Sequence, residues 1–499
     1  MRIVFYSSNS NIFSEETFKI SVMPRNSVTF CEFCEAHPEH EFFCVTQKPG
    51  MFLPEEVSGS HGAAEEDLKT AGSRRGAEEV SKTAGSHGYF SALPNVKYLP
   101  LETDTDSFAE CVASFKPDLA IAMTFWIEPY DWLPVSDALV AEKLREHGVR
   151  TICHSVQTAL ICFDKWRFHN ELARLGFDVP AAVFCDHDLY FCAGSNKDVL
   201  RNIYKESVLS QIKALKLPVI IKDTTGLSSY GLTVAHTYGE VAGYLNSKRN
   251  NSNRLIEEFI KGRQFGLEIY GVPGAYTVLP PFEFSVNQYG ITSPKQSVKY
   301  GPCELPDDLR ELMLKLAEGL GLCGAAQVDL ILDEAGGWHI IEVNPRLSGM
   351  TYTYAAACGL SVFEMMYKAV IEPANTRNEP GTTLIESAST VIATDTAVIE
   401  PAVTELSRRG EITAELKKFV MSLKLPLMSE NQMKEILQLE GVKLLNQTND
   451  LAAKQEREKG FCECIIAAQE KSVLQRAVAR FEEIYPGDAI ILQAKKMII

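Results

Sequence analysis

The chain has 499 residues and carries 49 lysines and arginines against 65 aspartates and glutamates, a net charge of −16. This acidic balance argues against a general nucleic-acid-binding protein, which needs a basic face. No apolar run approaches the roughly 18 residues of a membrane span, which argues against a membrane protein. The start, MRIVFYSS, shows no secretion signal, and the 13 scattered cysteines are typical of reduced thiols, so we expect a cytoplasmic protein.

The first 155 residues alternate short apolar runs with helical segments. Strand-like runs occupy 2–7, 41–46, 118–123 and 150–154, and a helical pattern occupies 136–147. This alternation predicts an N-terminal domain, 1–155, with an open parallel α/β sheet. Residues 59–88 repeat a unit of about 13 residues rich in Gly, Ser, Ala and Glu, with almost nothing to bury. We expect a disordered insertion there; a partner-docking loop is the alternative.

The N-terminal domain also contains a cluster of metal-ligand residue types. Cys31, Cys34, His37, His40 and Cys44 follow one another at a spacing that could suit zinc. Cys31 and Cys34 fall on an expected helix, however, and Cys44 falls on the next strand. Ordinary α/β packing is therefore the favoured interpretation.

Residues 156–372 have a mixed pattern that predicts a second domain. A helix is expected at 164–175 and another at 305–321, with strands at 219–222, 255–260, 265–270, 325–333 and 338–344. The run 254–268 has the pattern of a hairpin with a turn at Lys261 and Gly262. A proline-containing linker at 372–381 then leads to a third α/β unit, 373–499, with strands at 390–393 and 463–467 and a helix at 472–485.

The segment 326–346 carries the most informative pattern. Two strand-like runs flank Glu-Ala-Gly-Gly at 334–337, a plausible hairpin loop. This pairing puts Asp329 opposite Glu342, with Asn344 on the same face. Two carboxylates and an amide oxygen are hard ligands that suit Mg²⁺. A solvated polar face and a proton-sharing carboxylate pair are the alternatives.

Cationic residues accompany this hairpin. Arg346 follows it directly and could orient a carboxylate or phosphoryl oxygen, or simply pair with the two acids. Lys222 ends an apolar strand beside a loop, 223–231, whose glycines and hydroxyls can wrap phosphates. Lys165 stands at an expected helix N-terminus, which favours anions. Each signal alone also fits an ordinary surface residue or turn.

Taken in order, these segments resemble the ATP-grasp superfamily of ADP-forming ligases over about 156–372. The resemblance implies a three-domain, α/β and α+β architecture: the N-terminal domain, a two-lobed core with a small lobe at about 184–255 and a large lobe at about 256–372, and the C-terminal domain. It implies ATP and Mg²⁺ as cofactors, with two ions and Mn²⁺ as a substitute. The implied ligands of the ions are Asp329, Glu342 and Asn344, and Arg346 is the implied catalytic residue.

The same resemblance assigns the nucleotide contacts. Lys165 and Lys222 look like the two phosphate-binding lysines, and Glu257 looks like the acceptor for the adenine amino group. Gln264 stands where many members place an acidic residue for the ribose. The implied loop that covers the phosphates contains Ser228, Ser229 and Gly231. The implied hinge beside the adenine ring consists of Glu258, Phe259 and Ile260.

The implied reaction is the ATP-dependent joining of a carboxylate to an amine through an acyl phosphate. Gln327, which precedes the first metal aspartate, is usually Arg in D-alanine–D-alanine ligases, so the chain looks more like L-amino-acid ligases or the biotin-carboxylase branch. We expect small-molecule carboxylate and amine substrates, and a homodimer by analogy with similar ligases. The alternatives are phosphorylation of another carboxylate or of bicarbonate, and a catalytically silent nucleotide-binding protein.

Overall fold

The computed structural model describes residues 1–8, 26–46, 96–100, 104–124, 133–193, 199–225, 232–287, 291–292, 297–371, 416–447 and 462–498. The insertion predicted at 59–88, the linker at 372–381 and the strand at 390–393 lie outside these residues. Over the described ranges, every helix is too short or too polar to traverse a bilayer.

The N-terminal residues form a five-stranded parallel sheet in the order β3-β2-β1-β4-β5, which confirms the predicted open α/β arrangement. Strands β1, β2 and β4 are buried on both faces, as parallel strands usually are. One face packs on α1 and the other on α4 and α5. The strand that the sequence analysis did not predict is β3. The bounds are β1 Arg2–Ser7, α1 Asn26–Ala36, β2 Glu41–Thr46, β3 Val96–Pro100, α4 Thr105–Ser114, β4 Leu119–Ala122, α5 Leu133–Glu146 and β5 Thr151–Ile152.

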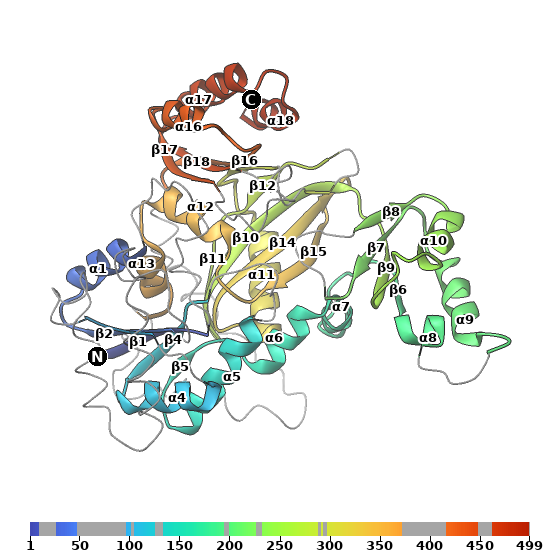
Figure 1. Cartoon of the computed structure of the whole chain (residues 1–499), viewed down its shortest axis with the longest axis horizontal. Helices are drawn as coiled ribbons and strands as arrows, with labels where there is room; N and C mark the ends of the chain where they lie inside the picture. Colours follow the sequence, from blue (N-terminus) through green and yellow to red (C-terminus); the bar gives the residue numbers. More distant parts are fainter. Residues whose placement is uncertain are drawn as a thin grey trace.

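A small antiparallel sheet follows, in the order β6-β9-β7-β8, and lies at the right of Figure 1. Helices α8 to α10 pack on it through a separate apolar cluster. Two further helices, α6 and α7, connect it to the N-terminal sheet. The bounds are α6 Val156–Phe163, α7 Lys165–Arg174, β6 Ala182–Cys185, α8 His187–Phe191, α9 Ile203–Ile212, β7 Val219–Asp223, β8 Thr233–Ala235, α10 Tyr238–Leu245 and β9 Arg254–Glu258.

The hairpin predicted at 254–268 is wrong, although both of its strands exist. β9 pairs with β6 and β7 in the small sheet, whereas β10 (Gly262–Val272) pairs with β11, β12 and β14 in the central sheet. At Gly262 a Cβ atom would lie 2.2 Å from the carbonyl oxygen of Leu332, so β10 begins in close contact with β14. Long-range pairing therefore outweighs the local turn, and the chain crosses here from one sheet to the other.

The central sheet runs in the order β15-β14-β10-β12-β13-β16-β18-β17, with β11 beside β10. Period-two alternation separates its faces. On β10, Phe265, Leu267 and Ile269 pack with α11, while Gln264 and Glu268 lie on the opposite face. The bounds are β11 Ala275–Val278, β12 Phe282–Phe284, β13 Ser297–Gly301, α11 Asp307–Leu320, β14 Gly324–Asp333, β15 Trp338–Asn344, α12 Gly349–Cys358, α13 Val362–Met366 and the π-helix η5 Tyr367–Ile371.

The C-terminal strands do not form a sheet of their own. β16 pairs with β13 of the central sheet, and β18 and β17 extend it further (Figure 1). Helices α16 to α18 cover one face of this extension. The C-terminal segment is therefore joined to the central sheet by backbone hydrogen bonds. The bounds are β16 Phe419–Leu425, α16 Glu430–Leu437, β17 Val442–Gln447, β18 Cys462–Ala468, α17 Lys471–Ile484 and α18 Ala489–Ile498.

Candidate functional site

Two carboxylates face each other across the β14–β15 ribbon. The register pairs Asp329 with Glu342 and Gln327 with Asn344, the two pairs that the sequence predicts. Next to the loop the expected pairing of Asp333 with Trp338 is wrong: Leu332 pairs with Trp338, and a register shift between Asp329 and Leu330 restores the predicted pairs. All four side chains lie on the face of the sheet opposite α11, where directly opposed Cβ atoms are about 4.5–5.5 Å apart. The Gln327 amide donates to an Asp329 oxygen at 2.8 Å, and the Asn344 amide lies 3.3 Å from a Glu342 oxygen. The ribbon thus gathers two acids and two amides on one surface.

The two acids have different electrostatic surroundings. Burial, and then the charge of Glu342, raise the pKa of Asp329 above its usual value. Burial also raises the pKa of Glu342, but Lys165, Asn344 and Arg346 outweigh it and leave that pKa lowered. The Lys165 ammonium lies 3.9 Å from a Glu342 oxygen. Glu342 is therefore held as an anion, whereas ionising Asp329 costs free energy.

The oxygen donors fit a hard divalent cation. A cation between the opposed acids would remove their repulsion, and carboxylate and amide oxygens are the donors that Mg²⁺ takes in proteins. Among the described residues, no ammonium or guanidinium nitrogen lies within 4.0 Å of the Asp329 carboxylate. Asp329, Glu342 and Asn344 would hold such an ion, which would supply neutralisation of phosphate charge.

Arg346 is fixed directly beyond β15. Its guanidinium donates to the Asn344 side-chain oxygen at 3.1 Å and to the Leu347 carbonyl at 3.3 Å. These bonds tie the cation to the same ribbon end that carries Asn344. The arginine therefore stands beside the acids without a direct ion pair to either of them among the described contacts.

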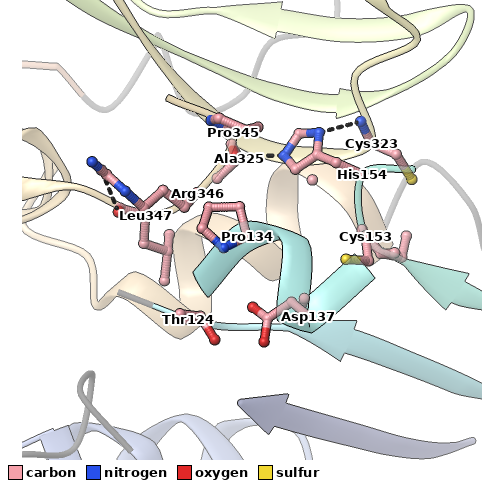
Figure 2. Close-up of a pocket in the computed structure, with 13 residues that line it drawn as sticks. Thr124, Pro134, Asp137, Cys153, His154, Cys323, Ala325, Pro345, Arg346 and Leu347 are labelled. Atoms are coloured by element: carbon pink, nitrogen blue, oxygen red, sulfur yellow. Dashed lines mark hydrogen bonds between the residues drawn. The ribbon is translucent and has the colours of Figure 1, made fainter. Parts of the chain in front are cut away.

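Arg346 also borders a small crevice between the N-terminal and central sheets (Figure 2). Below Arg346 in the view, Thr124 and Asp137 point toward one another. Asp137 accepts from the Ser8 backbone N–H at 3.0 Å, and burial raises its pKa to about 6. Ser8 and Thr124 follow β1 and β4, between which the direction of strand addition reverses. Ligands of open α/β sheets bind at such points.

Helix α7 connects the acids to the small sheet. Asp164 caps it by accepting from the N–H groups of Trp166 and Arg167, both at 2.9 Å. The Lys165 N–H donates to the Thr224 carbonyl beyond β7 at 2.7 Å, while its side chain approaches Glu342. Helix α7 therefore places Lys165 between the two sheets.

Lys222 and Glu257 form a buried ion pair in the small sheet. His169 of α7 adds a contact of 3.2 Å to the Glu257 carboxylate. Burial raises the pKa of Glu257, but Lys222 and His169 outweigh it and lower the pKa to about 2. In this arrangement Lys222 reaches toward Glu257, so a bound phosphate would have to compete for the same ammonium.

The predicted hinge residues lie between the two sheets. The N–H groups of Glu258 and Phe259 both donate to carbonyls of the small lobe, those of Ala181 and Pro218, at 3.0 Å. Ile260 follows them as a partly exposed residue.

Gln264 lies on β10, on the polar face, and accepts from the Thr292 hydroxyl at 2.5 Å. Ser228, Ser229 and Gly231, the predicted covering loop, lie outside the described residues.

Two residues of this surface were missed by the sequence analysis. Glu268 is buried on β10 and accepts from Ser348 at 2.9 Å and Thr351 at 2.7 Å. Burial raises its pKa to about 7 despite these bonds. Lys299 lies on β13, its ammonium 5.2 Å from the Phe284 ring centre. Alternation from Gln264 could have found Glu268, but nothing in the sequence pattern predicted β13.

The cysteine and histidine cluster of the N-terminal domain is used in packing. His37 contacts Glu364 at 3.0 Å and His40 contacts the Tyr367 hydroxyl at 3.2 Å, so both histidines tie α1 to the α13–η5 segment. Burial raises the pKa of the Cys34 and Cys44 thiols. In the part of the chain that the structure describes, no three His, Cys, Asp or Glu side chains are grouped to hold a metal ion.

Comparison with known proteins relates part of the chain to a known domain family. Residues 162–350 match the ATP-grasp domain. A D-alanine–D-alanine ligase from Buchnera aphidicola subsp. Schizaphis graminum (strain Sg) is 28% identical over 228 residues, which cover 43% of this chain and 70% of the relative.

Solved structures resemble almost the whole chain. The L-amino acid ligase from Bacillus licheniformis has a TM-score of 0.55 and 14% identity, with 97% of this chain and 96% of that chain covered. The ADP complex of an N5-carboxyaminoimidazole ribonucleotide synthetase has a TM-score of 0.56 and 12% identity, with 98% of each chain covered. At these identities the likeness establishes the fold, and it confirms the predicted mixed α/β class.

Proposed function

On the premise that residues 162–350 form an ATP-grasp domain, we propose that the protein is an ATP-dependent, ADP-forming ligase that joins a carboxylate to an amine. The family match confirms the ATP-grasp resemblance seen in the sequence. One observation carries the proposal: Asp329 and Glu342 are paired across the ribbon beside Lys165 and Arg346. This surface can hold a polyanionic nucleotide and a carboxylate at the same time.

The proposed chemistry has two steps. A carboxylate oxygen of the first substrate attacks the γ-phosphorus of ATP, the bond to the β–γ bridging oxygen breaks, and ADP leaves. The amine nitrogen of the second substrate then attacks the acyl carbon, and the carbon–oxygen bond breaks to release inorganic phosphate. The nitrogen loses a proton and the amide remains. Both steps bring negative oxygens together, so cationic groups are the main requirement.

The chain supplies these groups from both lobes. Lys165 and Lys222 would bind phosphate oxygens, and Arg346 would stabilise the charge of the acyl phosphate as the amine attacks. Asp329, Glu342 and Asn344 would hold Mg²⁺. Glu257 and the hinge at 258–260 would face the adenine, with Gln264 near the ribose. These roles are the sequence-based assignments, supported here by the common surface on which the central-sheet residues lie.

The proposal is tested by the products of ATP cleavage. Purified protein with ATP, Mg²⁺ and a mixture of the twenty L-amino acids should release ADP and inorganic phosphate, measured by ion-exchange chromatography. Release of AMP and pyrophosphate would contradict the acyl-phosphate mechanism. Asp329→Asn should lower the rate at least a hundredfold, because it removes a charged metal ligand. Glu334→Gln, which changes an exposed acid in the loop of the same hairpin, should leave the rate unchanged.

The alternative within the same fold is activation of bicarbonate or of another carboxylate. The likeness to an N5-carboxyaminoimidazole ribonucleotide synthetase supports it as a second candidate. Mass spectrometry of the products distinguishes the two, since ligation of amino acids gives a product lighter than its components by one water.

A further inference from the structure

The polar face of the central sheet continues into the C-terminal strands. Lys299 on β13 is paired with Ser422 on β16, and Lys424 on β16 is paired with Ser297 on β13 and with Glu463 on β18. Residues that are paired or two apart share a face. Lys299, Lys424 and Glu463 therefore lie together on one side of the sheet. The intervening residues, such as Leu423, point to the other side and pack under α16 to α18.

Helix α12 covers only part of this face. Val420, Ile465 and Ala467 of the C-terminal strands pack against it in one apolar cluster that includes Tyr354. Beyond the start of the helix the face becomes polar. A Cβ atom at Gly349, the first residue of α12, would lie 3.9 Å from the Lys299 ammonium. The lysine thus stands at the positive end of the helix dipole, so two sources of positive potential meet.

The surroundings of Lys299 indicate an anion as the missing neighbour. Within the described ranges no carboxylate oxygen comes within 4.0 Å of its ammonium. Burial, and then the charge of Lys424, lower the pKa of Lys299 to about 8, although the charges of Glu463, Asp329 and Glu268 act in the opposite direction. An anion beside Lys299 would offset part of the hydration that its ammonium loses on burial.

We propose that Lys424, supplied by the C-terminal segment, acts with Lys299 to bind a free carboxylate of the amine substrate, so that the second substrate is an amino acid and not a neutral amine. The inference rests on the proposed ligase function and deepens it. An acceptor carboxylate enters a site that already holds a polyanionic nucleotide, so it needs cations of its own. Glu463, directly opposite Lys424, would orient that lysine.

The test compares acceptors that differ only in this charge. The wild type is incubated with ATP, Mg²⁺ and an equimolar mixture of the twenty L-amino acids and their carboxamides, and mass spectrometry gives the ratio of products ending in a carboxylate to those ending in a carboxamide. We expect a ratio of at least ten, falling about tenfold in Lys424→Met. The matched control, Lys434→Met, changes an exposed lysine on α16 and should keep the wild-type ratio.

The outcomes separate this inference from the proposed function. ADP release with an unchanged product ratio in Lys424→Met would overturn the inference alone. An equal loss of both product classes would also overturn it, because that result indicates structural damage. The absence of ADP release from the wild type would overturn the ligase function and the inference that depends on it.

Discussion

Glu257 is a buried carboxylate that the fold keeps charged. Lys222 pairs with it from the neighbouring strand and His169 contacts it from α7. A buried pair of this kind adds little net stability, because both ions lose their hydration, but removing one partner leaves an uncompensated charge. The pair therefore matters most as a constraint on where the Lys222 ammonium lies before a nucleotide binds.

Glu257→Gln should destabilise the protein by about 3 kcal/mol, because Lys222 then remains buried without its counter-ion. Urea unfolding followed by circular dichroism measures the change. Glu258→Gln is the matched control, since the adjacent side chain accepts from the Lys216 N–H and a glutamine oxygen can replace it. Equal destabilisation by the two substitutions would show that the ion pair has no special importance.

At the scale of single residues, the sequence predicts some members of the candidate site and gives no indication of others. The opposition of Asp329 and Glu342 is expected from the loop and from alternation, which are local, but only when Asp333 pairs with Trp338. The structure pairs Leu332 with Trp338 instead, and a register shift between Asp329 and Leu330 brings the two acids opposite each other. Lys299 and Glu463 have no such local signal. Their importance depends on strands that come together across more than a hundred residues, which one sequence cannot reveal.

Among the helices, α7 was predicted to within one residue at each end. Asp164 caps it and Gly176 follows its last turn, so local chemistry defines both boundaries. The predicted hairpin between β9 and β10 fails for the opposite reason. The turn at Lys261 and Gly262 suits a hairpin locally, but β9 pairs with β7 in the small sheet and β10 pairs with β14 in the central sheet.

The cap of α7 provides a test of that helix as a positioning element. Asp164→Ala should cost about 1 kcal/mol of stability, and it should raise the KM for ATP several-fold because Lys165 begins the helix. Asp186→Ala removes the equivalent cap of α8, which accepts from the Leu189 N–H at 2.9 Å. It should cost similar stability and leave that KM unchanged. A KM effect of the same size in both variants would contradict the positioning role.

At the scale of the whole molecule, His154 joins the N-terminal sheet to the central sheet. His154 follows β5, and its two ring nitrogens contact the Ala325 carbonyl at 3.0 Å and the Cys323 N–H at 3.1 Å, as Figure 2 shows. The Nε2 atom donates to the Ala325 carbonyl and the Nδ1 atom accepts from the Cys323 N–H, which requires the neutral imidazole. Burial lowers the pKa of His154 to about 4. The junction therefore becomes weaker when this ring is protonated.

This pKa predicts an acid-dependent loss of stability. Above pH 6.5, the ordinary pKa, both folded and unfolded histidines are neutral and the contribution is complete. Between pH 6.5 and 4 only the unfolded chain takes the proton, so about 3 kcal/mol is lost. Urea unfolding across this range should show a smaller loss in His154→Gln than in the wild type. His147→Gln, at an exposed position, should follow the wild type; parallel curves for all three proteins would contradict the account.

The joining of the C-terminal strands to the central sheet is the main feature of the architecture that the sequence analysis did not predict. The pattern of 416–498 predicts strands and helices but carries no information on which sheet edge they extend. Because β16 pairs with β13, the C-terminal segment lies beside the candidate site and can contribute Lys424 and Glu463 to it. Partner strands are chosen by tertiary packing, which short-range patterns do not encode.

Isothermal titration calorimetry of ADP binding, with and without Mg²⁺, tests most directly whether the two opposed acids bind a nucleotide through a divalent ion. The wild type should bind ADP at least tenfold more tightly with Mg²⁺ than with EDTA, and Asp329→Asn should lose this difference while Glu334→Gln keeps it. Equal affinity with and without the metal in the wild type, or an unchanged metal dependence in Asp329→Asn, would contradict the assignment of this surface as the metal–nucleotide site.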